Sequence, residues 1–259
     1  MSKRHEAIGI KQAIRFEWME KTVNLLLSGL DTKEIRQELH EYLNDRMGSG
    51  VRQDRGAEAR SFAVGILMNT WVTPQPILLH LQKALLNSIE KDGNQIIVAH
   101  WAMISAAYPF WFNVARQTGR LLALQDMVTM RQITGRIVEE YGDRQTVIRN
   151  VQFVIRSFAF WGVLGETTTV GCYEKLASVS VVEPKLAILL FEAALHATSE
   201  AKCALGLLLN NPAFFPFQMP IINGDYVSQH SSHIDVIRYG LDDELLKLTK
   251  QPPVESRWV

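Results

Sequence analysis

The sequence predicts a mainly α fold: a multi-helical chain with an N-terminal helix-turn-helix-like unit and a central winged-helix-like unit that carries a small β-hairpin. Apolar residues recur at helical spacing along most of the chain, which is the primary signal of amphipathic helices. Only 9 prolines and 16 glycines interrupt the 259 residues. A short strand-like stretch follows a strongly amphipathic helix near residue 160, as expected for a helix followed by a hairpin.

The first expected unit, residues 1–75, contains three helices. They cover residues 10–30, 32–44 and 56–71. Thr32 is the expected N-cap of the second helix, because Ile35 and Leu39 follow it at helical spacing. Helix, glycine-containing turn and helix together give the outline of a helix-turn-helix.

The second expected unit, residues 76–128, is a central helical bundle. Its helices cover residues 76–90, 94–107 and 109–124. The run 96–114 is rich in apolar and aromatic residues, which raises the question of a membrane span. Polar side chains and a proline within that run favour a buried helix instead.

The third expected unit, residues 129–182, is winged-helix-like. Two helices cover residues 130–141 and 145–161, and strand-like segments follow at 163–164, 167–170 and 172–174. Helix, turn, helix and hairpin in this order is typical of a winged helix. The last unit, residues 183–259, is expected to be helical, with helices at 186–209 and near 241–250 around a polar segment at 221–238.

Composition excludes several classes of protein. Apolar residues make up 47% of the chain, and 27 basic residues balance 27 acidic ones. This balance excludes a chain that is disordered throughout and argues against a uniformly basic nucleic-acid coat protein. Two cysteines, Cys172 and Cys203, lie outside any CxxC motif, which together with a polar N-terminus predicts a reducing, cytoplasmic setting.

The helix expected at residues 145–161 has two opposite faces. Its apolar stripe consists of Val147, Val151, Val154, Phe158 and Trp161. Its opposite face consists of Gln145, Arg149, Gln152 and Arg156. Arginine can bond guanine bidentately and glutamine can bond adenine, so this face suits a DNA-recognition helix. The alternative is a solvated face that holds two good helix formers.

Local charge around this helix favours contact with DNA. Residues 116–156 carry seven arginines, no lysine and four acidic residues. Arginine is preferred to lysine where planar, bidentate contacts are made. Three further residues complete the candidate contacts of this unit: Arg144, Thr146 and, on the hairpin, Thr168. The alternative for Thr168 is a threonine that merely favours the strand conformation.

A second candidate DNA-contact surface follows the second expected helix. Residues 46–60 carry four arginines against two acidic residues. Arg52, Gln53 and Arg55 are the candidate contacts there, since such side chains bond phosphates and base edges. The alternative is a solvated turn.

Catalytic, metal and cofactor sites are not predicted. The chain has no GxxxxGK[ST], GxGxxG or GxSxG motif. His230, His233 and Asp235 offer possible metal ligands, but no cysteine is near and HExxH is absent, so a polar surface loop is favoured. The sequence therefore predicts a non-enzymatic protein without a cofactor.

Three stretches carry a resemblance to a known family. The first is LLLSGLDTKEIRQEL, followed by the arginine-rich turn and a helix that ends in LMNTWV. The second is VAHWAMISAAYPFWFNVARQTGRLL, and the third is RQITGRIVEEYGDRQTVIRNVQFVIRSFAFWGVLGETTTVGCY. In order and texture these stretches, which cover most of residues 15–175, resemble the BrxA family of small accessory proteins from BREX bacteriophage-defence systems.

The resemblance implies a predominantly helical, non-enzymatic DNA-binding accessory of host-DNA modification and phage exclusion. Its partners would be double-stranded DNA and other defence-system subunits, with no membrane. The arginine and glutamine face at residues 145–156 would be the primary contact surface. The chain is longer than the resemblance leads us to expect, so the segment after residue 183 receives no role from it.

Two other functions stay open. A protein–protein adaptor would use the aromatic stretch 101–112 and the segment 214–217 as docking surfaces. A transcriptional regulator would use the same helices as a DNA-binding accessory, with a steep preference for one operator sequence.

Overall fold

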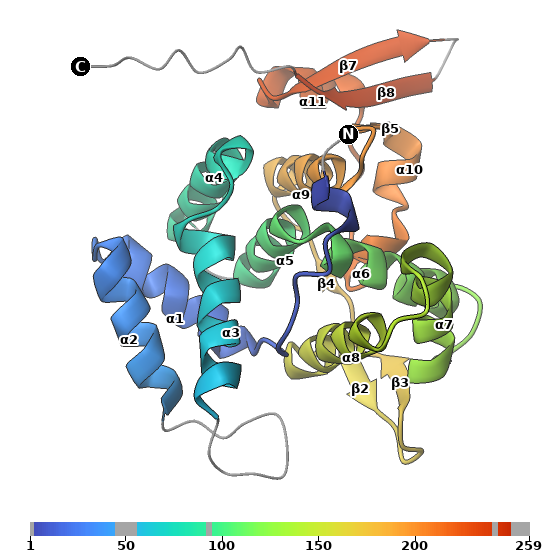
Figure 1. Ribbon diagram of the computed structural model, residues 1–259. Coiled ribbons are helices and arrows are strands. Elements are labelled where there is room, and N and C mark those ends of the chain that lie inside the picture. The colour runs from blue at the N-terminus through green and yellow to red at the C-terminus, as the bar shows by residue number, and fades with distance from the viewer. Residues whose placement is uncertain (1–2, 45–55, 92–94, 240–242, 250–259) are drawn as a thin grey trace.

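The computed structural model describes residues 3–44, 56–91, 95–239 and 243–249, and these residues are mainly helical (Figure 1). The mainly α fold class is therefore confirmed. Buried apolar side chains form one connected cluster that extends from Ile10 to Leu246. The expected units thus share a continuous core.

The middle of this core consists of long helices. These are α4 (Leu79–Lys91), α5 (Ile96–Ala107), α6 (Pro109–Leu122) and α9 (Pro184–Ala197), with the 3-10 turn η3 (Pro76–Leu78) before α4. Helix α5 packs against α4, α6 and α9 and is buried over most of its length. A helix that is apolar all round belongs in a protein core or a membrane, and α5 lies in the core.

The length and apolar composition of the helices bear on whether the chain could span a membrane. None of their helices is, alone, both long and apolar enough to cross a membrane. One bent pair, Ala57–Val72 with Pro76–Lys91, meets the length and composition criteria together, at an angle of 54°.

The N-terminal part is helical but begins later than predicted. Its elements are η1 (Lys3–Glu6), α1 (Phe16–Leu27), α2 (Thr32–Asn44), α3 (Ala57–Leu67) and the π-helical turn η2 (Met68–Val72). The prediction of a helix from residue 10 is wrong, because residues 7–15 have no regular structure. Their backbone instead bonds side chains of a helix about 140 residues later.

The N-cap of α2 is Asp31, so the prediction of Thr32 is wrong by one residue. The Asp31 carboxylate accepts hydrogen bonds from the backbone N–H groups of Lys33 and Glu34, at 2.7 and 2.9 Å. The Glu34 carboxylate accepts one in return from the Asp31 N–H at 2.7 Å. This reciprocal pattern is a capping box, in which the Asp31 side chain satisfies two free helical donors.

After α6 the chain alternates short strands with two helices. The elements are β1 (Met127–Thr129), α7 (Met130–Tyr141), α8 (Gln145–Phe160), β2 (Leu164–Glu166) and β3 (Cys172–Lys175). Strand β3 pairs antiparallel with both β1 and β2, which gives the sheet order β1-β3-β2. The sequence missed β1, because a three-residue strand is too short to show a period.

The predicted strand at 167–170 is wrong. These residues form the turn that joins β2 to β3. The Thr167 hydroxyl lies 3.2 Å from both the backbone N–H and the carbonyl oxygen of Thr169, and these local bonds replace a strand ladder.

The predicted helix at 186–209 is also wrong in its second half. Helix α9 ends at Ala197, and β5 (Lys202–Ala204) and α10 (Leu205–Leu209) follow. Ala201 has a φ of +52°, a left-handed conformation that an α-helix does not continue through. Three short elements come next: η5 (Pro212–Phe214), β6 (Phe217–Gln218), which pairs in parallel with β4 (Val179–Ser180), and α11 (Gly224–His230).

The last predicted helix, near 241–250, is a strand. β8 (Asp243–Leu248) pairs with both β7 (Ile234–Tyr239) and β5, in the order β5-β8-β7. Pairing on both edges satisfies the backbone of β8 and buries Leu246 completely, so tertiary context overrides the helix propensity of the leucines and lysine. The β7–β8 hairpin lies at the opposite end of the molecule from α8 and β2–β3 (Figure 1).

Candidate nucleic-acid interface

Helix α8 has the two faces that the sequence predicts. Its inner stripe is fully buried and consists of Val147, Val151, Val154 and Phe158. Its outer face consists of exposed Gln145, Arg149 and Arg156 with half-buried Gln152. Arg149 and Arg156 are separated by two helical turns, about 10 Å along the axis, which matches the rise of roughly three base pairs.

Helices α7 and α8 are joined by a tight three-residue link. Gly142 in this link has a φ of +84°, a conformation that glycine adopts without steric cost. Arg144 donates a guanidinium hydrogen bond to the carbonyl oxygen of Tyr141 at 2.9 Å, which closes the end of α7. Thr129 and Gln132 form a capping box at the start of α7, so this helix is fixed at both ends.

The two outer arginines of α8 are available for a ligand. Among the residues that the structure describes, neither Arg149 nor Arg156 forms an ion pair with an acidic side chain. Arg149 packs over the Phe153 ring, with 5.7 Å between the guanidinium carbon and the ring centroid. By contrast, Arg116 on α6 pairs with Glu140 at 3.3 Å, so its charge is already neutralised.

The β2–β3 hairpin adjoins the Arg156 end of α8. Burial raises the pKa of Tyr173 on β3, and Arg156 acts in the opposite direction through its nearby positive charge. Thr168, Thr169 and Val170 at the hairpin tip are exposed. The predicted contact Thr168 therefore lies on a projecting tip beside the helix that carries the other candidates.

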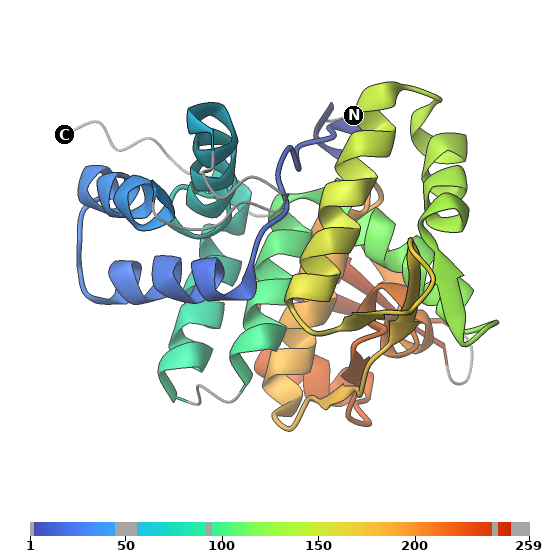
Figure 2. The same ribbon diagram turned by 90° about the horizontal axis from the view of Figure 1, so that it is seen from below.

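The N-terminal segment lies along another side of α8 (Figure 2). The Ile14 N–H donates to the Ser157 hydroxyl at 2.9 Å, and the Trp161 indole N–H donates to the Ile14 carbonyl oxygen at 3.0 Å. Farther along, a groove of about 320 Å³ opens between this segment, α3 and α8. Its lining includes Lys11, Glu58, Phe62, Thr146 and Arg149.

Arg149 and Thr146 thus form one wall of this groove, and the first turns of α3 form part of the opposite wall. The predicted contacts Arg52, Gln53 and Arg55 lie outside the described residues.

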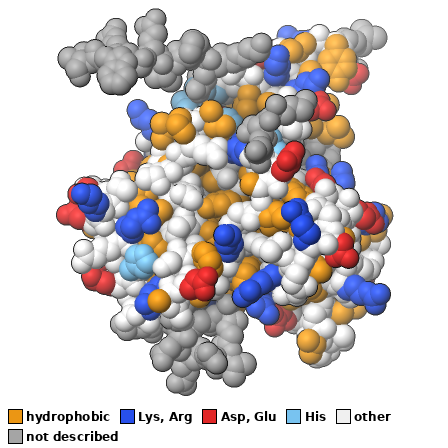
Figure 3. Space-filling model, in the orientation of Figure 1, with side chains coloured by type: hydrophobic (Ala, Val, Ile, Leu, Met, Phe, Trp, Pro, Cys, Tyr) orange, Lys and Arg blue, Asp and Glu red, His pale blue; other side chains and the backbone are white. Residues whose placement is uncertain are grey.

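Surface charge on the face drawn in Figure 3 is mixed. Lys and Arg side chains are interspersed with Asp and Glu side chains, in keeping with a net charge of zero. Any anion-binding surface on this protein is therefore local. The outer face of α8 is the candidate, because it carries the exposed Arg149 and Arg156.

The aromatic residues considered as an adaptor surface belong to the core. Trp101, Trp111, Phe214 and Phe215 are all at least nine-tenths buried. The Trp101 indole N–H donates to the Ala213 carbonyl oxygen at 3.1 Å. These side chains offer no docking surface to a partner.

The residues weighed in the sequence as possible metal ligands, His230, His233 and Asp235, do not come together as one group. His230 and Asp235 are engaged locally: the His230 ring lies 2.9 Å from the Tyr226 carbonyl oxygen, and Asp235 accepts a hydrogen bond from Thr249 at 3.0 Å. His233 lies instead beside His80 and Glu192. The sequence missed this grouping, because its members come from distant parts of the chain and no motif spacing connects them.

No protein-family model, no curated protein and no solved structure matches this chain. Its function is therefore argued from geometry and charge.

Proposed function

We propose that this chain is a non-enzymatic protein that binds double-stranded DNA, with α8 in the major groove. The observation that carries the proposal is the outer face of α8, where Arg149 and Arg156 are exposed, two helical turns apart and paired with no acidic side chain of the described part of the chain. Gln145 and Gln152 lie on the same face. Arginine and glutamine are the side chains that bond guanine and adenine edges in that groove.

The order of elements around α8 supports the same proposal. A helix, a strand, two helices joined by a glycine turn and a hairpin follow one another from α6 to β3, and the sheet order is β1-β3-β2. In a winged-helix reading α8 is the recognition helix, and the β2–β3 hairpin is the wing. Thr168 at its tip would bond a phosphate, a contact that positions the protein without reading sequence.

The opposite flank would supply further phosphate contacts. Lys11 lines the groove beside Arg149, and Glu58, Ala59 and Phe62 of α3 also line it. Together with the wing, this flank would let the protein contact the DNA phosphate backbone on both sides of the major groove. Contacts to phosphate make affinity fall as salt rises.

We further propose that DNA binding serves a BREX-like phage-defence system, with other defence subunits as partners. This part rests on the resemblance of three stretches to the BrxA family and on no other observation. Pull-down of neighbouring gene products after nuclease treatment tests it, because an association that survives without DNA is a protein contact.

The direct test is fluorescence anisotropy with a labelled random duplex at two salt concentrations. The Arg149→Ala, Arg156→Ala double variant should bind at least about tenfold more weakly, because each lost contact of this kind costs about 1–3 kcal/mol. The matched control is Lys202→Ala with Lys247→Ala, a cross-strand pair of β5 and β8 at the far end of the molecule. It removes the same charge and should leave affinity unchanged.

Two outcomes would contradict the proposal. Absence of binding by the unaltered chain at low salt would exclude a DNA-binding role. Equal loss of affinity in both double variants would show a diffuse charge effect and exclude the α8 face. A steep preference for one promoter over random duplex would identify a transcriptional regulator among DNA-binding proteins.

A further inference from the structure

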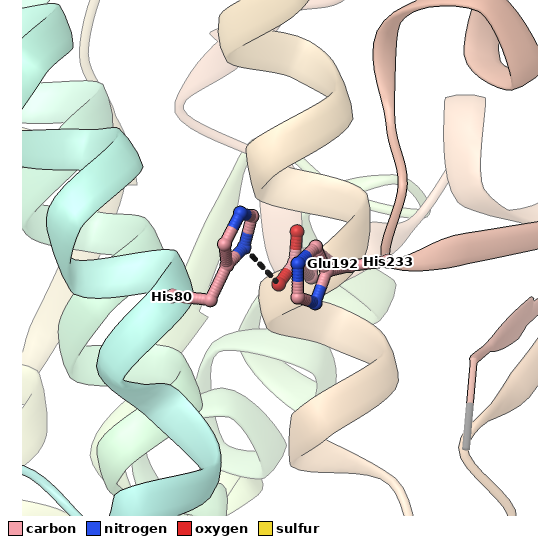
Figure 4. Close-up of side chains that lie close together, drawn as sticks. All are labelled: His80, Glu192 and His233. Carbon is pink, nitrogen blue, oxygen red and sulfur yellow. Dashed lines mark ion pairs between the residues drawn. The ribbon is translucent and has the colours of Figure 1, made fainter. Parts of the chain in front are cut away.

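Three side chains that could bind a metal ion converge between the helical body and the C-terminal hairpin (Figure 4). His80 comes from α4, Glu192 from α9 and His233 from the residue before β7. One ligand atom from each lies within 4.8 Å of the other two. His80 Nδ1 lies 3.7 Å from Glu192 Oε1.

The carboxylate in this cluster is buried and accepts no hydrogen bond from the described residues. The Glu192 side chain is only 2% exposed. Its nearest polar neighbours among the described residues are His80 and His196, at 3.7 and 3.8 Å, which is beyond hydrogen-bonding distance. A buried carboxylate is costly unless it is hydrogen-bonded, paired with a cation or coordinated to a metal, so a bound metal ion would stabilise Glu192.

The two imidazoles are stacked beside that carboxylate. The rings of His80 and His233 are nearly parallel, at 17°, with centroids 3.2 Å apart. Backbone bonds fix His233: its N–H donates to the Ser231 hydroxyl at 3.2 Å, and its carbonyl oxygen accepts from the Thr249 N–H at 2.9 Å. His80 is 42% exposed and can adjust its position.

Solvent reaches the cluster from two sides. A cavity of about 340 Å³ is lined by His5, His196 and His233. A second, of about 290 Å³, is lined by His80, Glu192 and His230. Five of the seven histidines of the chain therefore line these two cavities, and Figure 3 shows histidine side chains gathered below the upper hairpin. An ion has an open path to the cluster, as a usable metal site requires.

We propose that His80, Glu192 and His233 bind one Zn²⁺ ion and that the ion fastens the β7–β8 hairpin to α4 and α9. Two imidazoles and a carboxylate are a common ligand set for zinc, with bonds of about 2.0–2.2 Å. Tetrahedral ligands at that range lie about 3.4 Å apart. The ligand atoms, now within 4.8 Å of one another, must therefore approach by up to about 1.5 Å, and the stacked rings of His80 and His233 must turn so that both lone pairs point at one ion. His196 Nε2, four residues after Glu192, lies 3.8 Å from the same carboxylate oxygen that His80 Nδ1 approaches.

Calorimetric titration of the EDTA-treated full chain with ZnCl₂ tests the proposal. The expected result is one ion per chain and a melting temperature that rises with Zn²⁺ but not with Mg²⁺. Loss of a contact that only supports a ligand costs metal affinity about 10- to 100-fold. The His80→Ala, His233→Ala double variant loses two ligands, so its Zn²⁺ affinity should fall by at least about 100-fold. The control His40→Ala removes a histidine of α2 that lines neither cavity, and this variant should bind as the unaltered chain does.

Two results of the titration would overturn the zinc proposal. These are no saturable binding at one ion per chain, and equal binding by the double variant and the His40→Ala control. Circular dichroism establishes that each variant is folded. If the double variant is not, the single His80→Ala variant decides, because this partly exposed side chain can be removed without opening the core.

Discussion

The indole N–H of Trp161 donates a hydrogen bond of 3.0 Å to the backbone carbonyl of Ile14, and this bond joins the end of α8 to the N-terminal segment. Both residues are buried. Loss of the donor would leave a buried carbonyl oxygen without a partner, which costs about 1–3 kcal/mol.

Trp161→Phe should therefore destabilise the protein by more than Trp71→Phe. Trp71 is equally buried, and its indole nitrogen has no partner among the described residues, so its replacement removes similar bulk without breaking a bond. Urea denaturation measures both changes. We expect a difference of about 1–2 kcal/mol between them. Equal losses would mean that the bond to Ile14 contributes nothing net.

Two helical glycines should respond oppositely to alanine. A Cβ at Gly119 in α6 would lie 1.9 Å from the carbonyl oxygen of Pro212, whereas a Cβ at Gly135 in α7 meets nothing within 4 Å. Gly135→Ala should stabilise the protein by about 0.5–1 kcal/mol, which is the ordinary gain within a helix.

Gly119→Ala should destabilise it by at least about 2 kcal/mol, because backbone on one side must move. Thermal denaturation of the two variants compares them directly. Stabilisation by both substitutions would show that α6 and η5 are not in close contact.

His100 should give the protein an acid-sensitive stability. Its ring is fully buried, with edge-on contacts to Phe16 and Trp71 at 5.5 Å. Burial lowers the pKa of His100 to about 3, well below its ordinary value of 6.5. Between these two values the unfolded chain binds a proton that the folded chain does not, so stability is complete above about pH 6.5 and falls as the pH decreases.

His100→Phe should remove this contribution while keeping an aromatic ring in the pocket. The loss of unfolding free energy between pH 7 and pH 5 should shrink by about 2 kcal/mol, measured by urea denaturation at both values. His40→Ala on α2 is the control for a partly exposed histidine. If His100→Phe loses as much unfolding free energy between pH 7 and pH 5 as the unaltered protein, groups other than His100 cause the acid sensitivity.

A lysine at the hairpin tip should strengthen DNA binding. Thr168→Lys places a cation where the proposed wing faces a phosphate, and one added contact should steepen the slope of log K against log salt by about 0.9. Leu207→Lys is the charge-matched control, because Leu207 is an exposed residue of α10, away from the β2–β3 hairpin. Equal slopes in the two variants would mean that the hairpin does not approach the duplex.

The sequence predicted α7 and α8 almost to the residue, since local signals define their ends. Thr129 and Gln132 cap α7, and Gly142 ends it with a positive φ. The apolar stripe of α8 was equally readable, because burial follows the helical period.

The errors arise where distant residues decide the structure. Leu246 has a helix former's preference, yet pairing with β5 and β7 places it in a strand. Residues 10–15 continue an apolar pattern, but bonds to Ser157 and Trp161 hold them out of a helix. The cluster of His80, Glu192 and His233 could not be predicted from the sequence for the same reason, since three separate elements contribute to it.

The bonds of Ile14 to Ser157 and Trp161 also affect how the chain folds during synthesis. The partners of Ile14 lie 143 and 147 residues later in the chain. At translation rates of about 5–20 residues per second, they are made roughly 7 to 30 s after Ile14 itself. During this time the hydrogen bonds of Ile14 cannot form. The contact between the N-terminal segment and α8 is therefore made only after Trp161 has left the ribosome.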